Sequence, residues 1–564
     1  MWCRTPWPSV RRSRSRARVH CARGSVESRP SSRVVAGRPG AGSGGSGMSE
    51  PVVIAGAGPV GMVGALLLAR HGVASVVLEA QPRRVAVGSR SICVQRDVLD
   101  ILERVGVGAL VADAGVTWTR GRTYFREHQV LEITFPEVGD SAFPPFVNTP
   151  QSVVELLLEQ RLAEEPLIEV RWGQEVTSVA QDDHGVDVAT RGGVVRGSHL
   201  IAADGQRSAV RHALGLAFDG MSFSDKFLIA DIRAELGYSV PERRFYFDPP
   251  WNPGRQVLLH PQPHGVWRID WQVPDQFDLA TERDNGGLDE RIRAVVGDRG
   301  YDIVWLSVYR FHQRMASRMR VGRILLAGDA AHAMSPFGAR GLNSGVADAD
   351  NAVWKIVLAG QGRAGPGLLE SYHLERGAAA EENLRITGDT MRFLVPQTDA
   401  EKARRVNVLE RAVDDPDART EIDSGKLAEP FWYVDSPLTT GDRLVRFPRE
   451  PGAARPPVAG VLCPDGRLDR GMRLRELVGP RFVVLTHWCP WRPADDWERE
   501  LVGQPVPLDQ EEDDHLVQAL RLRPRSLVVV RPDGHLAAVL REPEPPEPIG
   551  PLVTAALRRA TGWG

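Results

Sequence analysis

The chain has 564 residues, of which 42% are hydrophobic and 25% are charged, and its formal net charge is −2. These values are typical of a globular protein and exclude collagen-like, coiled-coil and largely disordered chains. No run of about eighteen apolar residues occurs, which argues against a membrane-spanning helix. The five cysteines have no CxxC or other metal-ligand spacing, so we expect a reducing compartment, a cytoplasmic location and no metal.

Residues 1–47 differ from the rest of the chain in charge. They contain ten arginines and one acid, Glu27, which gives +9, and they end in a Gly/Ser-rich stretch. We expect a disordered extension here, arising either from a start codon assigned too early or as an Arg-rich transit peptide or basic arm. The remaining 60 basic and 71 acidic residues give −11, so we expect no nucleic-acid partner and no membrane partner.

A strand, a glycine-rich turn, a helix and a second strand ending in an acid follow as in a dinucleotide-binding βαβ unit. In chain order these are Val52–Ala55, Gly56–Gly61, Met62–His71, Ala74–Leu78 and Glu79. We expect Gly56 to allow the tight turn, Gly58 to let a pyrophosphate approach the backbone, and Gly61 to let helix and strand pack closely. Glu79 would accept hydrogen bonds from ribose hydroxyls.

Two other GxGxxG matches exist, at Gly42–Gly47 and Gly360–Gly365, but neither follows a strand and opens a helix. The chain therefore has one mononucleotide fold and no separate nicotinamide domain. Any nicotinamide nucleotide should bind transiently, in an exposed groove.

Two more strands end in recognisable motifs. Leu200–Ala203 runs into ADGQRSAVR, and Arg323–Ala327 runs into GDAAHAMSPFGARGLNSG. A helix should begin near Gly341, because apolar residues then repeat at helical spacing. That face comprises Leu342, Val346, Ala349, Val353 and Ile356.

The combination of GAGPVG, ADGQRSAVR and GRILLAGDAAHAMSPFGARGLNSG resembles the flavin-dependent aromatic hydroxylases, the p-hydroxybenzoate hydroxylase family. Within it, the length, the tail and the RRFYFDPP stretch are similar to the 3-(3-hydroxyphenyl)propionate hydroxylase and pentachlorophenol monooxygenase branch. The resemblance implies an α/β fold, with a Rossmann-type FAD-binding domain and an interleaved β-sheet substrate domain.

The resemblance also implies a set of site residues. Those expected to bind the cofactor are Gly56, Gly58, Gly61, Glu79, Arg90, Gln151, Asp204, Gly205, Gly328, Asp329, Gly338, Arg340, Gly341, Leu342 and Asn343, and those expected in catalysis are Pro336, Arg268 and Asn343. In the family pattern the Pro336 carbonyl lies beside the substrate hydroxyl, and a cation at Arg340 raises the flavin potential.

Simpler interpretations of several of these residues stay open. Arg90 and Arg340 could be surface charges, and Arg268 an exposed cross-strand charge. Gln151 could merely begin a helix, Asp204 could merely belong to a turn, and Asp329 could be a helix N-cap.

Alternating residues between about 220 and 275 predict an antiparallel substrate sheet. Its candidate lining residues, each of which could equally belong to the core, are Tyr246, His260, Trp267 and Trp271. The full domain prediction is the extension 1–47, the FAD and substrate domain 48–395, a linker 396–457, and a thioredoxin-like domain 458–564. This last domain lacks CxxC, because Arg492 stands where Cys489 would need its partner, so we expect a structural or dimer module rather than a reactive cysteine.

The function implied is an FAD-dependent aromatic monooxygenase that uses NADPH or NADH and O2. It would hydroxylate a small phenolic substrate through a C4a-hydroperoxyflavin. Two alternatives stay open: a flavin NAD(P)H oxidase or reductase without hydroxylation, and a non-catalytic flavin-binding scaffold. A homodimer is the expected oligomer.

Overall fold

The computed structural model describes residues 50–85, 91–135, 141–441, 445–448, 455–468, 471–508, 514–541 and 548–564. The extension 1–47 and Arg90 lie outside these residues. Residues 46–564 form one unit, and the fold is described for that unit alone.

A six-stranded sheet, ordered β17-β18-β11-β1-β2-β7, forms the nucleotide-binding half. Its strands are β1 (Val52–Ala55), β2 (Ser75–Glu79), β7 (Ile168–Trp172), β11 (Leu200–Ala202), β17 (Arg320–Val321) and β18 (Ile324–Leu326). All neighbours pair in parallel except β17 with β18. The inner strands are almost continuously apolar because helices cover the sheet. The predicted strands in this half are therefore confirmed within one or two residues.

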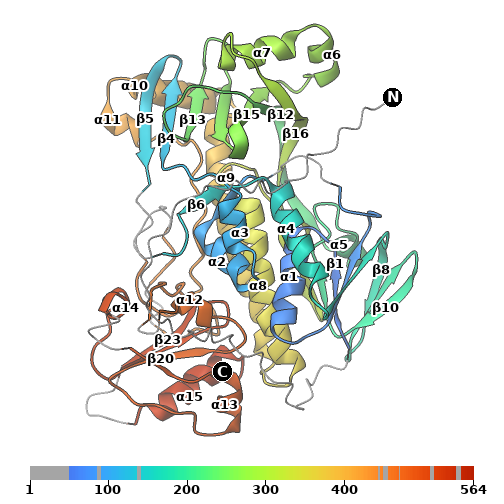
Figure 1. Cartoon of the computed structure of the whole chain (residues 1–564), viewed down its shortest axis with the longest axis vertical. Helices are drawn as coiled ribbons and strands as arrows, with labels where there is room; N and C mark the ends of the chain where they lie inside the picture. The colour runs from blue at the N-terminus through green and yellow to red at the C-terminus, as the bar shows by residue number, and fades with distance from the viewer. Residues whose placement is uncertain are drawn as a thin grey trace, which may run out of the picture. The chain divides into compact units, whose positions relative to one another are not determined.

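Helices pack around this sheet. They are α1 (Pro59–Arg70), α2 (Arg96–Arg104), α3 (Gly108–Asp113), α4 (Gln151–Ala163), α5 (Ala209–Ala213), α8 (Arg340–Gly360) and α9 (Gly367–Leu394). Figure 1 shows α8 between α1 and α2, and α8 also contacts α9. Helix α8 begins beside the predicted Gly341, and four of its five predicted apolar positions are buried, with Leu342 half-buried.

An eight-stranded sheet, ordered β19-β16-β12-β15-β14-β13-β4-β5, forms the second half. Its strands are β4 (Arg120–Phe125), β5 (His128–Thr134), β12 (Phe218–Arg233), β13 (Glu242–Phe247), β14 (Gln256–Pro261), β15 (Val266–Val273), β16 (Asp302–Ala316) and β19 (His332–Ala333). The sheet predicted for 220–275 is present but is wider than expected, because segments distant in sequence extend both edges. It is also mixed, since β13 pairs with β4 in parallel.

The two faces of the eight-stranded sheet differ. Leu228, Ile269 and Trp271 pack under α6 (Leu279–Asp284) and α7 (Gly287–Val296) on the outer face. The opposite face carries Phe227 and Phe245, which pack with Phe337 and with the end of α9. We call this second face the inner face, because Phe337 belongs to the loop that opens α8.

Smaller elements accompany these two halves. They are β3 (Cys93–Gln95) with β6 (Phe146–Asn148), β8 (Val176–Gln181) with β9 (Val186–Thr190) and β10 (Gly193–Gly197), and the short turns η1 (Pro263–Gly265) and η2 (Gly328–Ala330). The predicted linker contains two helices, α10 (Asp399–Arg411) and α11 (Pro416–Arg419), whose apolar residues join the inner-face core.

The C-terminal region has a four-stranded sheet ordered β21-β20-β22-β23. Its elements are α12 (Leu474–Leu477), β20 (Val483–His487), α13 (Asp496–Leu501), β21 (Val506–Pro507), α14 (Asp514–Ala519), β22 (Ser526–Val530), β23 (Leu536–Arg541) and α15 (Gly550–Ala560). Buried charges join it to the body: the Glu375 carboxylate accepts from Arg531 Nη1 at 2.6 Å and from Lys355 Nζ at 2.7 Å. Cys489 is a free, buried thiol whose pKa is raised by burial.

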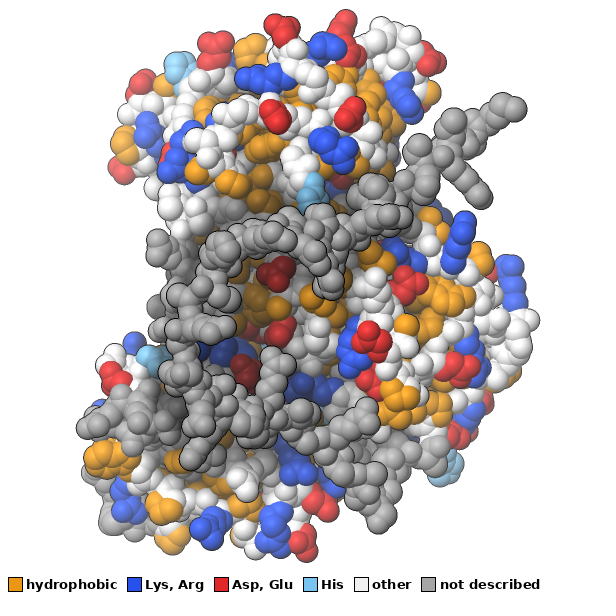
Figure 2. Space-filling model, viewed as in Figure 1, with side chains coloured by type: hydrophobic (Ala, Val, Ile, Leu, Met, Phe, Trp, Pro, Cys, Tyr) orange, Lys and Arg blue, Asp and Glu red, His pale blue; other side chains and the backbone are white. Residues whose placement is uncertain are grey.

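On the face in Figure 2, the visible Lys/Arg and Asp/Glu side chains are interspersed, and acidic side chains occupy a hollow near its middle. Within the described ranges, no helix is long and apolar enough to cross a bilayer.

Candidate functional site

Four predicted site residues lie at one edge of the six-stranded sheet. Gly56 follows β1, Glu79 ends β2, Asp204 lies just beyond β11, and Asp329 lies just beyond β18. These strands are adjacent and parallel, in the order β18-β11-β1-β2. Their carboxyl ends therefore meet, which is where nucleotides bind in such sheets. The strand order thus brings together motifs separated by more than 270 residues, from Gly56 to Asp329.

The three glycines of the first turn have distinct environments. Gly56 has φ +98°, and a Cβ there would lie 2.4 Å from the Ala203 carbonyl oxygen. A Cβ on Gly61 would lie 2.0 Å from the Gly56 carbonyl oxygen, so both positions exclude any side chain. A Cβ on Gly58 would meet nothing within 4 Å. Packing within the protein explains Gly56 and Gly61. Gly58 instead leaves open space at the N-terminus of α1, where free N–H groups favour a phosphate.

Glu79 supports the same turn. Its Oε2 accepts a hydrogen bond from the Ala57 amide at 2.8 Å, and its Oε1 accepts one from the Gln81 amide at 2.9 Å. The carboxylate is therefore fixed beside the glycine-rich turn, in the position from which a ribose could be bound.

Asp204 lies just before α5, and its carboxylate contacts the start of that helix. Its Oδ2 accepts from the Val210 amide at 3.2 Å, while its Oδ1 is buried and has no hydrogen-bond partner among the described residues. Burial raises the pKa of this carboxyl group. Gly205 follows with φ +78° and open space at its Cβ position. A buried acceptor without a partner beside open space indicates a ligand.

Gly328 and Asp329 form the turn η2. The N-cap of this turn is Ala327, so the helix N-cap alternative for Asp329 is wrong. Asp329 is exposed. Gly328 has φ +60°, and its amide donates to Asp348 Oδ2 at 2.9 Å.

The network beneath Gly328 was missed by the sequence analysis. Asp348 is fully buried on α8, and its carboxylate also contacts His332 Nε2 at 2.7 Å and Arg376 Nε at 2.6 Å. These contacts lower the pKa of Asp348. The sequence did contain a signal for this network, because Asp348 lies among the apolar positions predicted for the helix. A buried charge of this kind requires partners.

The loop that opens α8 contains Pro336, Gly338 and Ala339. Pro336 is exposed, and its carbonyl accepts from the Ala339 amide at 3.1 Å. Gly338 has φ +91°, and a Cβ there would lie 2.2 Å from the Lys426 carbonyl oxygen. Gly341, by contrast, would place its Cβ in open space. The first turn of α8 therefore has free space beside its N–H groups, and its dipole favours negative charge.

Asn343 is held by backbone groups. Its Oδ1 accepts from the Gln95 amide at 3.0 Å, and its Nδ2 donates to the carbonyl oxygens of Cys93 at 3.0 Å and Ala339 at 2.6 Å. The side chain thus joins β3 to α8. This geometry gives it a positioning role.

The surface-charge alternative for Arg340 is wrong, because only 2% of the residue is exposed. Its Nη2 donates to the carbonyl oxygens of Lys426 and Leu427, both at 3.1 Å, and its Nη1 donates to Asn383 Oδ1. Burial lowers the pKa of Arg340 to about 10. The guanidinium therefore fastens residues 426–427 over the loop that opens α8.

The exposed alternative for Arg268 is also wrong. The residue is 2% exposed and forms a two-point ion pair with Asp231, through Nε to Oδ1 at 2.8 Å and Nη2 to Oδ2 at 2.9 Å. The strands β12 and β15 place the pair on the inner face. Gln151 does begin α4, as its simpler interpretation had it, but its Oε1 also accepts from the Ser91 amide at 3.2 Å.

Of the four aromatic or imidazole candidates on the substrate sheet, only His260 lies on the inner face. Trp271 is fully buried in the outer-face core, and Tyr246 and Trp267 pack against that core. Alternation along β15 explains this, since Arg268 and Asp270 occupy the positions between Trp267, Ile269 and Trp271.

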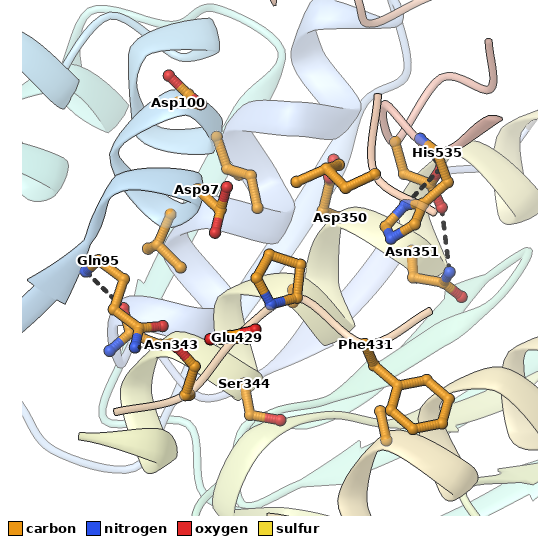
Figure 3. A pocket seen from close by; sticks show the side chains of 18 of the residues that line it. Gln95, Asp97, Asp100, Asn343, Ser344, Asp350, Asn351, Glu429, Phe431 and His535 are labelled. Atoms are coloured by element: carbon orange, nitrogen blue, oxygen red, sulfur yellow. Dashed lines mark hydrogen bonds and ion pairs between the residues drawn. The ribbon is translucent and has the colours of Figure 1, made fainter. Parts of the chain in front are cut away.

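A separate cavity of about 90 Å³ lies between α2, α8, α9 and the C-terminal region. Figure 3 shows Gln95, Asn343 and Ser344 at one end of its lining, and Asp350, Asn351 and His535 at the other. It is far smaller than the roughly 300 Å³ at which ligand pockets begin, and it is lined in part by Arg340 and Asn343 of the first turn of α8. Among the described residues, no group of three or more His, Cys, Asp or Glu side chains could hold a metal ion.

The residues at the sheet edge fit FAD. Open space at Gly58, Gly205 and Gly341 meets helix N-termini and the buried, unpartnered oxygen of Asp204. Hydroxyl-rich and phosphate-bearing groups need such acceptors and N–H donors.

Comparisons with known proteins agree with this geometry. A family model described as FAD binding domain matches residues 49–387. The chain is 36% identical over 348 residues to the dialkyldecalin synthase of Streptomyces rugosporus, which covers 59% of this chain and 70% of that protein. It is 28% identical over 443 residues to the 3-(3-hydroxy-phenyl)propionate/3-hydroxycinnamic acid hydroxylase of Mycobacterium sp. (strain KMS), covering 77% of this chain and 74% of that protein.

A solved structure, that of the flavin-dependent monooxygenase PieE in complex with FAD and substrate, matches with a TM-score of 0.75. The match covers 91% of this chain and 99% of that chain at 24% identity, and so supports the fold alone.

Proposed function

Because this chain belongs to the FAD binding domain family, we propose that it is an FAD-dependent monooxygenase that uses NAD(P)H and O2 to hydroxylate an aromatic substrate. The family resemblance expected from the three motifs is confirmed. The observation that carries the proposal is the meeting of Gly56, Glu79, Asp204 and Asp329 at neighbouring carboxyl ends of one parallel sheet.

The residues that would hold FAD follow from their surroundings. The N-terminus of α1 at Gly58 would receive the pyrophosphate, Glu79 a ribose, and Asp204 and Asp329 the hydroxyl-bearing chain. The first turn of α8, from Arg340 to Asn343, would direct N–H groups and a positive dipole end toward the ring system. When bound, FAD supplies the hydride acceptance and oxygen activation that no side chain provides.

The protein's own contribution is positioning. Asp348 fixes Gly328, Asn343 fixes β3 against α8, and Arg340 fastens residues 426–427. The Asp231–Arg268 pair holds a charge-neutral patch on the inner face, which would cover the aromatic substrate. Rigid support of this kind lowers the cost of orienting reactants.

The domain arrangement belongs to the same proposal. Residues 48–395 would form the FAD and substrate domain, 396–457 a linker with helical segments, and 458–564 a thioredoxin-like structural module. The four-stranded sheet with α13 and α15 supports the last assignment. We also propose a cytoplasmic enzyme and a homodimer.

The test is a screen of NADPH and NADH oxidation by purified protein against phenols, phenylpropionates and polyketide quinols, with product mass. A substrate should accelerate nicotinamide oxidation and gain about 16 mass units, the mass of one oxygen atom. Peroxide release without product across the panel would indicate an oxidase instead.

A second candidate function is ring formation without oxidation, favoured by the 36% identity to a dialkyldecalin synthase. It predicts bound flavin, product isomeric with substrate, and no nicotinamide consumption. Mass analysis of the same reactions separates the two.

A further inference from the structure

A row of polar side chains crosses the inner face of the eight-stranded sheet. Strand pairing sets Asp231 opposite Arg268, and Arg268 opposite His260. Arg244 of β13 pairs with Leu259 of β14. The adjoining residues on these antiparallel strands, Arg243 and His260, are therefore neighbours on the inner face. Asp270 lies two residues along from Arg268 and therefore shares this face.

The charges of this row do not balance. Asp231 and Arg268 neutralise one another. Burial, with the two nearby arginines, lowers the pKa of His260 well below 6.5, so its ring is neutral at pH 7. Burial also raises the pKa of Asp270 to about 7. What is left on this row is the guanidinium of Arg243, which is opposed electrostatically by Asp270 and, from outside the row, by Asp423.

Arg243 has bonding capacity to spare. Its Nη2 donates to the Ser424 carbonyl oxygen at 2.5 Å, and among the described side chains it forms no ion pair. A guanidinium has five N–H donors. The surrounding protein lowers its pKa to about 10, yet part of the side chain stays accessible. Those properties describe a half-buried cation with N–H donors that no described side chain uses.

Residues 424–425 place Arg243 close to the loop that opens α8. Ser424, which Arg243 contacts, is 5% exposed, and a Cβ on the next residue, Gly425, would lie 3.5 Å from the Gly338 amide nitrogen. Polar atoms without partners lie on the same side of the sheet. Both amide atoms of Gln262, a residue only 5% exposed, and Oδ1 of Asp270 are buried and have no hydrogen-bond partner among the described residues.

We infer that Arg243 binds an anionic oxygen of the aromatic substrate, either a carboxylate substituent or the phenolate itself. The inference rests on the proposed function, because it assigns the substrate to the inner face beside the loop that opens α8. A planar guanidinium binds both kinds of oxygen, and an accepting oxygen would complete its hydrogen bonds. The buried amide of Gln262 and the carboxyl group of Asp270 would then bind the remaining polar groups of the ligand.

The test measures binding to the FAD-loaded protein by calorimetry and by the change in flavin absorbance, without turnover. Two matched pairs separate the sources of the anion: 3-hydroxyphenylacetate with its primary amide, and 4-cyanophenolate with 4-methoxybenzonitrile. In the wild type, the anionic member of at least one pair should bind ten-fold tighter or more. Equal affinity within both pairs would overturn the inference without recourse to any variant.

The variant Arg243→Gln should weaken binding of the anion about ten- to hundred-fold and change binding of its neutral partner less than three-fold. Arg243→Lys should give an intermediate loss. The control is Arg244→Gln, whose side chain lies on the outer face and pairs with Glu242. It should leave anion selectivity unchanged, and equal selectivity in Arg243→Gln and Arg244→Gln would contradict the inference.

Failure of the proposed function gives a different pattern. Anion selectivity that depends on Arg243 without any oxygenated product would retain the binding site and reject hydroxylation. Oxygenated product without anion selectivity would support hydroxylation and reject the binding site at Arg243.

Discussion

Two glycines that protein packing does not require are the sharpest test of the cofactor site. A Cβ on Gly58 or Gly341 would meet no atom within 4 Å, and neither residue has positive φ. Gly58 has φ −72° and ψ 174°, a conformation that alanine adopts freely, and Gly341 lies in the first turn of α8. Substituting either by alanine should leave the apoprotein as stable as the wild type, or more stable by up to about 1 kcal/mol.

The same substitutions should weaken FAD binding, because the added methyl group occupies the space that the cofactor needs. We expect the dissociation constant to rise at least ten-fold, about 1.4 kcal/mol. Quenching of FAD fluorescence by apoprotein measures it, and thermal unfolding of the apoprotein reports folding. Gly300→Ala, at an exposed site with equally open space, is the control and should change neither quantity.

Gly61→Ala, by contrast, should destabilise the apoprotein. Its Cβ would lie 2.0 Å from the Gly56 carbonyl oxygen, so the apoprotein itself should lose about 1–3 kcal/mol. Wild-type FAD affinity in folded Gly58→Ala and Gly341→Ala proteins would refute the assignment of these spaces to FAD.

Three further predictions concern buried charges. Glu375→Gln leaves Arg531 and Lys355 buried without a full counter-charge, so the free energy of unfolding in urea at pH 7 should fall by about 3–5 kcal/mol. The control, Glu381→Gln at an exposed site, should leave that free energy unchanged. Equal unfolding midpoints for the two variants would contradict a stabilising network. Burial raises the folded-state pKa of Asp270 from its ordinary value to about 7. Its contribution to stability is therefore lost as the pH rises from about 4 to about 7, and the loss is complete above pH 7. Asp270→Asn should unfold at a higher temperature than the wild type at pH 8.5 and at the same temperature near pH 3, and a difference that stays constant across pH would contradict the raised pKa. Arg340→Gln removes the hydrogen bonds from Arg340 to the Lys426 and Leu427 carbonyl oxygens. The free energy of unfolding should fall by about 2–4 kcal/mol, and proteolysis near residue 426 should become faster. Unchanged proteolysis would argue against the role of Arg340 in holding residues 426–427.

Local patterns predicted the nucleotide-binding half of the fold well. The apolar run Val52–Ala55 is β1 to the residue, and the turn after it has the packing expected of Gly56 and Gly61. These features depend on neighbours in sequence, where steric rules act directly. The meeting of β1, β11 and β18 was not predicted, because strand order is a long-range property that local patterns do not contain.

Side-chain environments could not be predicted in the same way. Arg340 and Arg268 are both buried, although a charged residue in a loop or an alternating strand is usually exposed. Each is buried because distant segments supply acceptors: carbonyl oxygens of residues 426–427 for Arg340, and Asp231 for Arg268. Pairing across 37 or more residues leaves no local signature in the sequence.

The inner face shows the same limit. Alternation correctly indicated strands in the region of β12 to β15, but it did not say which face would meet the loop that opens α8. Packing of Trp271 under α7 decides this, and it places His260, Asp270 and Arg243 on the inner face.

The most direct test of the central claim is the fate of ¹⁸O₂ in a reaction with NAD(P)H and the best aromatic ligand. We expect yellow, FAD-containing protein, nicotinamide oxidation accelerated by that ligand, and a product heavier by about 18 mass units because it contains one ¹⁸O atom from O2. Protein that binds no FAD, or product that contains no label while nicotinamide stays unconsumed, would contradict it.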